Sequence, residues 1–279
     1  MLPIWRRVAF LCLSLLLASS SACKRVVQSY SLHKYDEQIA QATRDLAGND
    51  DDSSVVNALT VRGRAYAEKA RLLASTRSIS AADYDRLIGR AIADQARAIS
   101  RLPHHAEPYA ERGQTYYERG TVVGLDREES PDARGIWLLL AQTDFTRALE
   151  RRPHYAFAFD MRARARAALG DWDGVIADLT ELTKIDGAAQ GRLADAYCSR
   201  GEKLRVAKDY EGAIADFEKS ISLGATREGS SCDPFALLAA VYLDGTHAYD
   251  KARDVLRRAR DSKRKIPKDL EQRLSRPSR

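Results

Sequence analysis

The stretch GEKLRVAKDYEGAIADFEKSISLGA, residues 201–225, decides the fold. Its second half begins with a small residue, Ala213, and has an aspartate three positions on, at Asp216. The apolar residues that follow recur at helical spacing. An amphipathic segment with the small residue Gly201 lies just upstream. The stretch therefore predicts a pair of amphipathic helices joined by a short turn.

The same pair of patterns recurs along the chain. Segments similar to the second half of the stretch begin at Ala91, Ala141 and Val175, and a looser copy begins at Ala252. The aspartate recurs three positions into the first three of these copies and into the stretch itself, as Asp94, Asp144, Asp178 and Asp216. Each copy follows an amphipathic segment with a small residue in its first half. Self-similarity of this kind is typical of repeat architectures, in which each unit buries its apolar face against its neighbours.

The paired pattern resembles the tetratricopeptide repeat (TPR), a helix-turn-helix unit of about 34 residues. In that family a small residue at position 8 of the first helix faces one at position 20 of the second. The resemblance assigns position 8 to Gly63, Gly113, Ala163, Gly201 and Ala240, and position 20 to Ala91, Ala141, Val175, Ala213 and Ala252. It covers residues 57–265 and implies an all-α fold, a right-handed α-solenoid of about five helix-turn-helix hairpins.

The first two repeats are longer than the family pattern. From Gly63 to Pro103, and from Gly113 to Pro153, the chain runs 40 positions, against about 24 in the usual unit. Serines and a proline suited to helix starts predict second helices over about 80–101 and 131–151. The first two hairpins should therefore be elongated. The apolar run IWLLLA at 136–141 lies in the second of them, where it is either buried core or a docking patch.

The segment at 35–48, YDEQIAQATRDLAG, matches the second helix of the deciding stretch when Tyr35 is aligned with Tyr210. We expect an N-terminal capping helix there, because terminal repeats of a solenoid need a cap. The acidic break NDDD at 49–52 separates it from the first full repeat.

The N-terminus is typical of an export signal. Arg6 and Arg7 precede a short apolar run, which is too short to span a bilayer, and small residues follow it. The segment Ser-Ser-Ala-Cys at 20–23 resembles the lipobox of bacterial lipoproteins, in which the cysteine is acylated and becomes the first mature residue. The resemblance implies a signal peptide over 1–22, lipidation of Cys23 and a lipid-anchored tether over 23–34. Because Ser20 replaces the usual leucine, ordinary secretion with cleavage after Ala22 is the alternative.

The charge is concentrated at the C-terminus. The whole chain carries a formal charge of +6, and residues 257–279 hold ten basic and three acidic side chains, a net +7. We expect a basic tail over 266–279. Such a tail can bind anionic surfaces or simply improve solubility. A secreted protein seldom meets nucleic acid, so nucleic acid is not an expected partner.

Two cysteines remain after Cys12, inside the signal, and Cys23. Cys198 and Cys232 are an even pair in a compartment that permits disulfides. In the repeat register Cys198 is position 5 of the fourth first helix, and Cys232 lies just before the fifth. Adjacent helices pack about 8–10 Å apart, so a disulfide is geometrically allowed, and two free thiols are the alternative.

Motifs for catalysis are missing from the sequence. It has no glycine-rich phosphate loop, no paired-cysteine zinc spacing, no His-Glu-x-x-His run and no nucleophile elbow. We therefore expect no enzyme, no metal and no cofactor.

The TPR resemblance implies an interaction scaffold that holds a protein or peptide partner in a concave groove lined by first helices. The polar groove candidates are Asn57, Arg64, Gln114, Tyr117, Asp160, Arg164, Glu202 and Arg205. With the lipobox, this predicts a scaffold on the periplasmic face of the bacterial envelope, anchored to the outer membrane and supporting assembly of an envelope or secretion complex. The alternative is a periplasmic lipoprotein that binds a small ligand and is linked to solute uptake.

Overall fold

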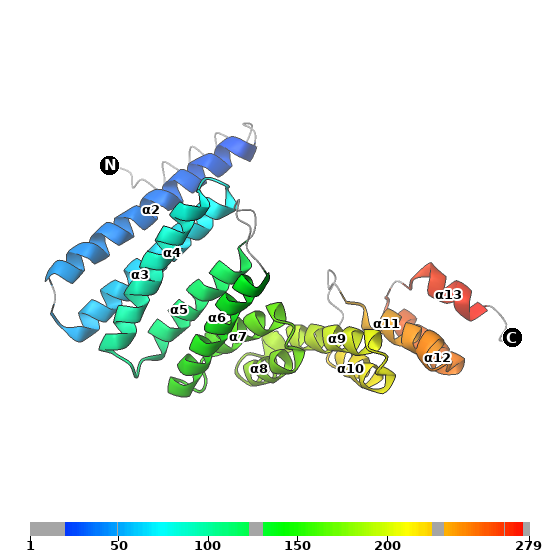
Figure 1. Ribbon diagram of the computed structural model, residues 1–279. Helices are drawn as coiled ribbons and strands as arrows, with labels where there is room; N and C mark the ends of the chain where they lie inside the picture. The colour runs from blue at the N-terminus through cyan, green and yellow to red at the C-terminus, as the bar shows by residue number, and fades with distance from the viewer. Residues whose placement is uncertain (1–19, 49, 123–130, 225–231, 265, 276–279) are drawn as a thin grey trace. The chain divides into compact units, whose positions relative to one another are not determined.

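The computed structural model describes residues 20–48, 50–122, 131–224, 232–264 and 266–275 (Figure 1). Throughout these ranges the regular structure is helical, which confirms the predicted all-α fold. The chain divides into two compact units, unit 1 over Met1–Arg152 and unit 2 over Pro153–Arg279. Residues 1–19 of the predicted signal peptide lie outside the described residues.

Unit 1 holds the helix α2 and two long hairpins. α2 (Ser20–Gly48) is followed by the hairpin of α3 (Asp52–Ser75) and α4 (Ala81–Arg101), and then by that of α5 (Ala106–Thr121) and α6 (Pro131–Arg151). α2 packs antiparallel to α3 (Figure 1), with Gln28 donating a 2.9 Å hydrogen bond to Thr76 near one end. Leu46 packs on Val55 and Leu59 near the other end.

The elongated hairpins are present as predicted. α3, α4 and α6 have 24, 21 and 21 residues, whereas α7 and α8 of the next hairpin have 13 and 14. α4 begins after Ser80, whose hydroxyl accepts a 3.1 Å hydrogen bond from the amide of Asp83, and the bounds of both second helices match the predicted ranges.

Unit 2 holds three shorter hairpins. The helices are α7 (Ala156–Ala168), α8 (Trp172–Ile185), α9 (Gln190–Val206), α10 (Tyr210–Ser222), α11 (Pro234–Ala240), α12 (Tyr249–Asp261) and α13 (Lys268–Ser275). At the tight turns a residue with positive φ, Gly170 or Lys208, is followed by an aspartate that caps the next helix. A 3₁₀ turn over Gly187–Ala189 joins α8 to α9.

The two helices of a hairpin meet at the small residues assigned from the repeat register. All five residues at position 20, together with Gly63, Gly113, Ala163 and Gly201 at position 8, are buried. The Cβ positions of Gly113 and Gly201 would lie 2.9 Å from the rings of Phe145 and Phe217. A small side chain is therefore required there by the close approach of the helices.

The structure departs from the sequence predictions at both ends of the chain. The capping helix predicted over 35–48 begins at Ser20, so the segment predicted as a tether from residue 23 to 34 is helical. No proline or glycine interrupts that segment, and nothing in it stops a helix. At the other end, much of the predicted tail forms α13, whose Leu270 is buried in the core of unit 2.

The fifth hairpin is irregular. Its first helix, α11, continues as a π-helical turn over Val241–Gly245. Gly245 lies under the ring of Tyr210, where a Cβ would come within 2.7 Å of the ring. Ala240, the position-8 residue of this hairpin, is only half-buried. The looser match of this repeat to the family pattern thus corresponds to a real change in helix geometry.

Candidate partner-binding face

In unit 1 the predicted groove residues lie on α3 and α5, which contact each other. Asn57 and Arg64 of α3 are exposed, and Gln114 and Tyr117 of α5 are half-buried. Arg64 donates from Nε to Glu111 at 3.0 Å and so joins the two first helices. Gln114 donates a 2.9 Å hydrogen bond to Glu118 one turn further along. Side chains of α3 and α5, the first helices of the two long hairpins, thus form the polar contacts of the candidate binding face in unit 1.

Glu118 of α5 has a perturbed carboxyl on this face. Burial raises the pKa of its carboxyl, the hydrogen bond from Gln114 lowers that pKa, and the negative charge of Glu68 raises it again. The net effect is an elevated pKa. The charged form of Glu118 is therefore less favourable here than in water.

In unit 2 the candidates lie on α7 and α9. Asp160 accepts a 3.0 Å contact from Arg164 on its own helix, and it also pairs with Arg192 of α9. Glu202 and Arg205 form a two-bonded pair, with both N–O distances 2.7 Å. The hydrogen bonds from Arg205 lower the pKa of Glu202. The eight candidates therefore fall into two groups, one in each unit.

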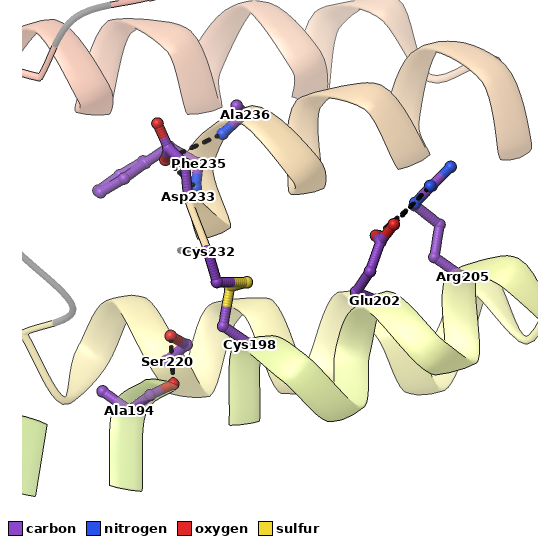
Figure 2. Close-up of a disulfide and its surroundings, with 9 residues drawn as sticks. All are labelled: Ala194, Cys198, Glu202, Arg205, Ser220, Cys232, Asp233, Phe235 and Ala236. Carbon is purple, nitrogen blue, oxygen red and sulfur yellow. Dashed lines mark hydrogen bonds and ion pairs between the residues drawn. A yellow bond between two sulfur atoms is a disulfide. The ribbon is translucent and has the colours of Figure 1, made fainter. Parts of the chain in front are cut away.

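Cys198 and Cys232 form a disulfide in the structure (Figure 2), with their Cα atoms 6.1 Å apart. Cys198 lies on α9 and is fully buried, while Cys232 lies two residues before α11 and is half-buried. Asp233 follows directly and caps α11 by accepting hydrogen bonds from the amides of Phe235 and Ala236 at 3.1 and 3.3 Å. The disulfide therefore holds the start of the fifth hairpin against α9.

Within each unit, neighbouring first helices are joined by one specific bridge. Arg64–Glu111 joins α3 to α5, and Asp160–Arg192 joins α7 to α9. Cys198–Cys232 joins α9 to the start of α11. These bridges link neighbouring first helices within each unit, two through ion pairs and one through a disulfide.

A second set of ionic contacts, which sequence reasoning missed, lies between the helices of each hairpin. The repeated aspartate is buried in four hairpins, where it accepts hydrogen bonds from arginine on the first helix. The distances from the arginine nitrogens to the aspartate oxygens are mostly 2.6–2.9 Å. The pairs are Arg62–Asp94, Arg112–Asp144, Arg162–Asp178 and Arg200–Asp216. Each arginine directly precedes a position-8 residue. An arginine at this position in every repeat that also has the aspartate is the sequence signal that indicates the pairs. These residues hold the two helices of each hairpin together.

The fifth hairpin lacks both members of this pair. At the two equivalent positions it has Ala239 and Val255, which are 0% and 2% exposed. Replacement of both members of the arginine–aspartate pair by apolar residues is physically sensible. A buried charge without its partner strongly destabilises a fold, whereas a pair of apolar residues does not.

The described parts of the chain show no group of three or more His, Cys, Asp or Glu side chains able to hold a metal ion. A crevice of about 560 Å³ in unit 2 lies beside Trp172 and Leu204. Its charged lining residues are Asp171, Asp173, Arg200 and Lys203. Among the described helices, none is long and apolar enough to cross a bilayer.

Cys23 lies in the first turn of α2, and its side chain is outside the described part of the structure. Lipidation of Cys23 thus stays a prediction from the sequence.

The chain folds into antiparallel hairpins whose two helices cross at small residues, and within each unit successive hairpins place their first helices next to each other. This arrangement defines a TPR-like helical-repeat protein. No protein-family profile matches the sequence. Similar curated proteins include tetratricopeptide repeat protein 36 of Danio rerio, 30% identical over 120 residues that span 42% of this chain and 62% of that protein. The human protein of the same name is 28% identical over 124 residues, 41% of this chain and 65% of that protein.

The chain thus spans less than two thirds of the length of these relatives. Among solved structures, a thermophilic TPR protein from Thermus thermophilus is 20% identical, with a TM-score of 0.44 over 81% of this chain and 94% of that one.

Proposed function

We propose that this protein is an envelope-anchored scaffold that binds a protein or peptide partner along its first helices. The observation that carries the proposal is the bridged first-helix face. Within each unit, adjacent first helices are joined by Arg64–Glu111, Asp160–Arg192 or Cys198–Cys232. An extended partner needs such a preorganised surface, because ordering a mobile one on binding would reduce affinity.

The polar character of the face supports a peptide ligand. Side chains such as Asn57, Arg64 and Gln114 offer donors and acceptors to a partner backbone while remaining at least partly exposed. The alternative, uptake of a small ligand, calls for an apolar cavity walled by the long hairpins. The crevice beside Trp172 has a charged lining and lies between the α7–α8 turn and α9 in unit 2, so the long hairpins do not wall it. It therefore does not favour that alternative.

Site-specific photocrosslinking in the producing cell tests the scaffold proposal. We expect a crosslinker at Asn57 or Gln114 to capture a discrete partner, because these positions lie on first helices. Arg97 is the matched control, since it is exposed on the second helix α4. Equal capture from Arg97 and Gln114 would show that the first-helix face is not the binding surface.

The anchor is tested separately. Metabolic labelling with an alkyne analogue of palmitate should mark the protein through Cys23, and Cys23→Ser should abolish the label. Several acyl chains hold a protein firmly, whereas one alone binds reversibly. We propose the outer membrane as the location, because Lys24 is not the aspartate that retains lipoproteins at the inner membrane of enteric bacteria. Equal labelling of Cys23→Ser would remove the anchor, and membrane fractionation tests the location.

A further inference from the structure

The apolar run IWLLLA is divided between the core and the surface of unit 1. Leu138 and Ala141 are buried. The side chains that form an exposed stripe one helical turn long are Ile136, Leu139 and Leu140, which are 58%, 54% and 38% exposed. Residues at i, i+3 and i+4 share one face of a helix. α6 therefore presents an exposed apolar stripe, defined by these three residues.

The stripe lies in the first half of α6, the half nearer to the end of unit 1 where the described chain begins. Gln28, in the first turns of α2, contacts Thr76 at the end of α3. Val122, which follows α5, packs on the cluster that contains Ala74 and Tyr84. Gly120 lies against Leu138 of α6. The beginnings of α2, α4 and α6 and the ends of α3 and α5 thus meet at one end (Figure 1), called here the anchor end.

We propose that the apolar stripe contacts the surface of the bilayer to which Cys23 is anchored. This inference rests on the proposed anchor, because the lipid would be attached in the first turn of α2, at the anchor end. A bilayer that holds this end through the lipid is the apolar phase nearest to the stripe. Trp137, next to the stripe and half-buried, packs its ring against Tyr116 and Arg119 of α5, so it lies beside the stripe on a fixed part of unit 1.

The size of the stripe argues for a bilayer rather than a second copy of the chain. Three partly exposed side chains present on the order of 200 Å² of apolar surface, against roughly 800 Å² per partner in a standard protein interface. A contact of that size does not hold two proteins together alone. It can set the orientation of a protein that a lipid already holds at the membrane.

Tryptophan quenching by lipids with brominated acyl chains tests the contact. The chain has three tryptophans, so Trp5→Phe with Trp172→Phe leaves Trp137 as the reporter. The full-length gene is expressed, and the protein is purified as the cell processes it and reconstituted into vesicles. We expect brominated lipid to reduce Trp137 emission, and we expect the double substitution Ile136→Asn with Leu139→Asn to abolish that loss while the protein still floats with the vesicles.

A reporter at the opposite end of unit 1 is the matched control. His104, in the exposed turn between α4 and α5, is replaced by Trp in a background in which Trp5, Trp137 and Trp172 are all Phe, and its emission should not fall. Quenching of both reporters, or of neither, overturns the stripe contact when the protein floats. Failure to float overturns the anchor and the stripe contact together. A dimer that the stripe substitutions convert to a monomer shows that a second copy covers the stripe, which also overturns the proposal.

Discussion

Gly201 of α9 lies directly against the ring of Phe217 of α10, and a Cβ at Gly201 would come within 2.9 Å of the ring. Gly113 and Phe145 repeat this relationship at 2.9 Å in unit 1. Both rings are fully buried and have no room to move aside. The glycine thus fixes how closely the two helices of a hairpin approach, and its role is in packing.

Gly201→Leu and Gly113→Leu should each lower the free energy of unfolding by about 1–3 kcal/mol, because extra methyl and methylene groups overpack a filled crossing. Thermal melting followed by circular dichroism measures the loss. Gly89 is the control, since it lies on the exposed face of α4 with nothing within 4 Å of a Cβ. Gly89→Ala should raise the stability by about 0.5–1 kcal/mol. An unchanged melting temperature for both leucine variants would contradict the assigned repeat register.

A single substitution that breaks the Arg112–Asp144 pair should strongly lower the free energy of unfolding. Arg112 donates two hydrogen bonds to Asp144 at 2.6 and 2.9 Å, and Asp144 is 2% exposed. Asp144→Ala leaves the half-buried guanidinium with its main partner removed and should cost about 3–5 kcal/mol. Chemical denaturation measures this cost.

The fifth hairpin suggests the compensating change. Arg112→Ala together with Asp144→Val copies the residues at Ala239 and Val255. This double variant should be more stable than Asp144→Ala alone, because no buried charge remains without a partner. A double variant that is no more stable than Asp144→Ala would contradict the account in which the unpartnered buried charge causes the loss.

Much of the fold was predictable because its causes are local. Helical spacing, the small residues at Gly113 and Ala141, and the proline at Pro153 are all visible in the chain. The sequence shows the repeated aspartate, but it does not predict the ion pairs. Burial of Asp144 depends on an arginine 32 residues away on another helix, and the sequence alone does not show that the two side chains meet.

The groove candidates illustrate a second limit. The repeat register placed Arg64 and Asp160 on the first-helix face, but their partners Glu111 and Arg192 lie in neighbouring repeats. Spacing within one repeat does not identify contacts between repeats. The same reasoning explains why the disulfide was left open between Cys198 and Cys232, since its geometry depends on how the fifth hairpin packs.

Glu118 predicts a pH dependence of stability. Its pKa is raised in the folded state, mainly by burial. The carboxyl therefore binds its proton more tightly in the folded than in the unfolded chain, so its contribution is most favourable below the unfolded pKa and is lost as pH rises through the folded pKa. Glu118→Gln should raise the melting temperature at about pH 7.5 and have little effect near about pH 4, which thermal melting at the two pH values measures.

Glu202 provides the opposite control. Arg205 lowers its folded-state pKa, so its contribution is present above the unfolded pKa and is lost as pH falls through the folded pKa. Glu202→Gln should lower the melting temperature at neutral pH more than at acidic pH. If both glutamine variants shift in the same direction at neutral pH, the electrostatic account of Glu118 and Glu202 is wrong.

The disulfide makes the last prediction. It closes a loop of 34 residues and attaches the irregular fifth hairpin, which lacks the arginine–aspartate pair, to α9. The loop-entropy relation gives such a link about 3–4 kcal/mol of stabilisation, because the crosslink restricts the unfolded chain. Cys232→Ser should therefore lower the melting temperature, and a reducing agent should lower it for the unsubstituted protein but not for Cys232→Ser. Mass spectrometry of non-reduced peptides should find the crosslink between Cys198 and Cys232, with both thiols open to alkylation only after reduction. Full alkylation of Cys198 and Cys232 in the native, oxidised protein would show that they are free, and packing alone would then hold the fifth hairpin against α9.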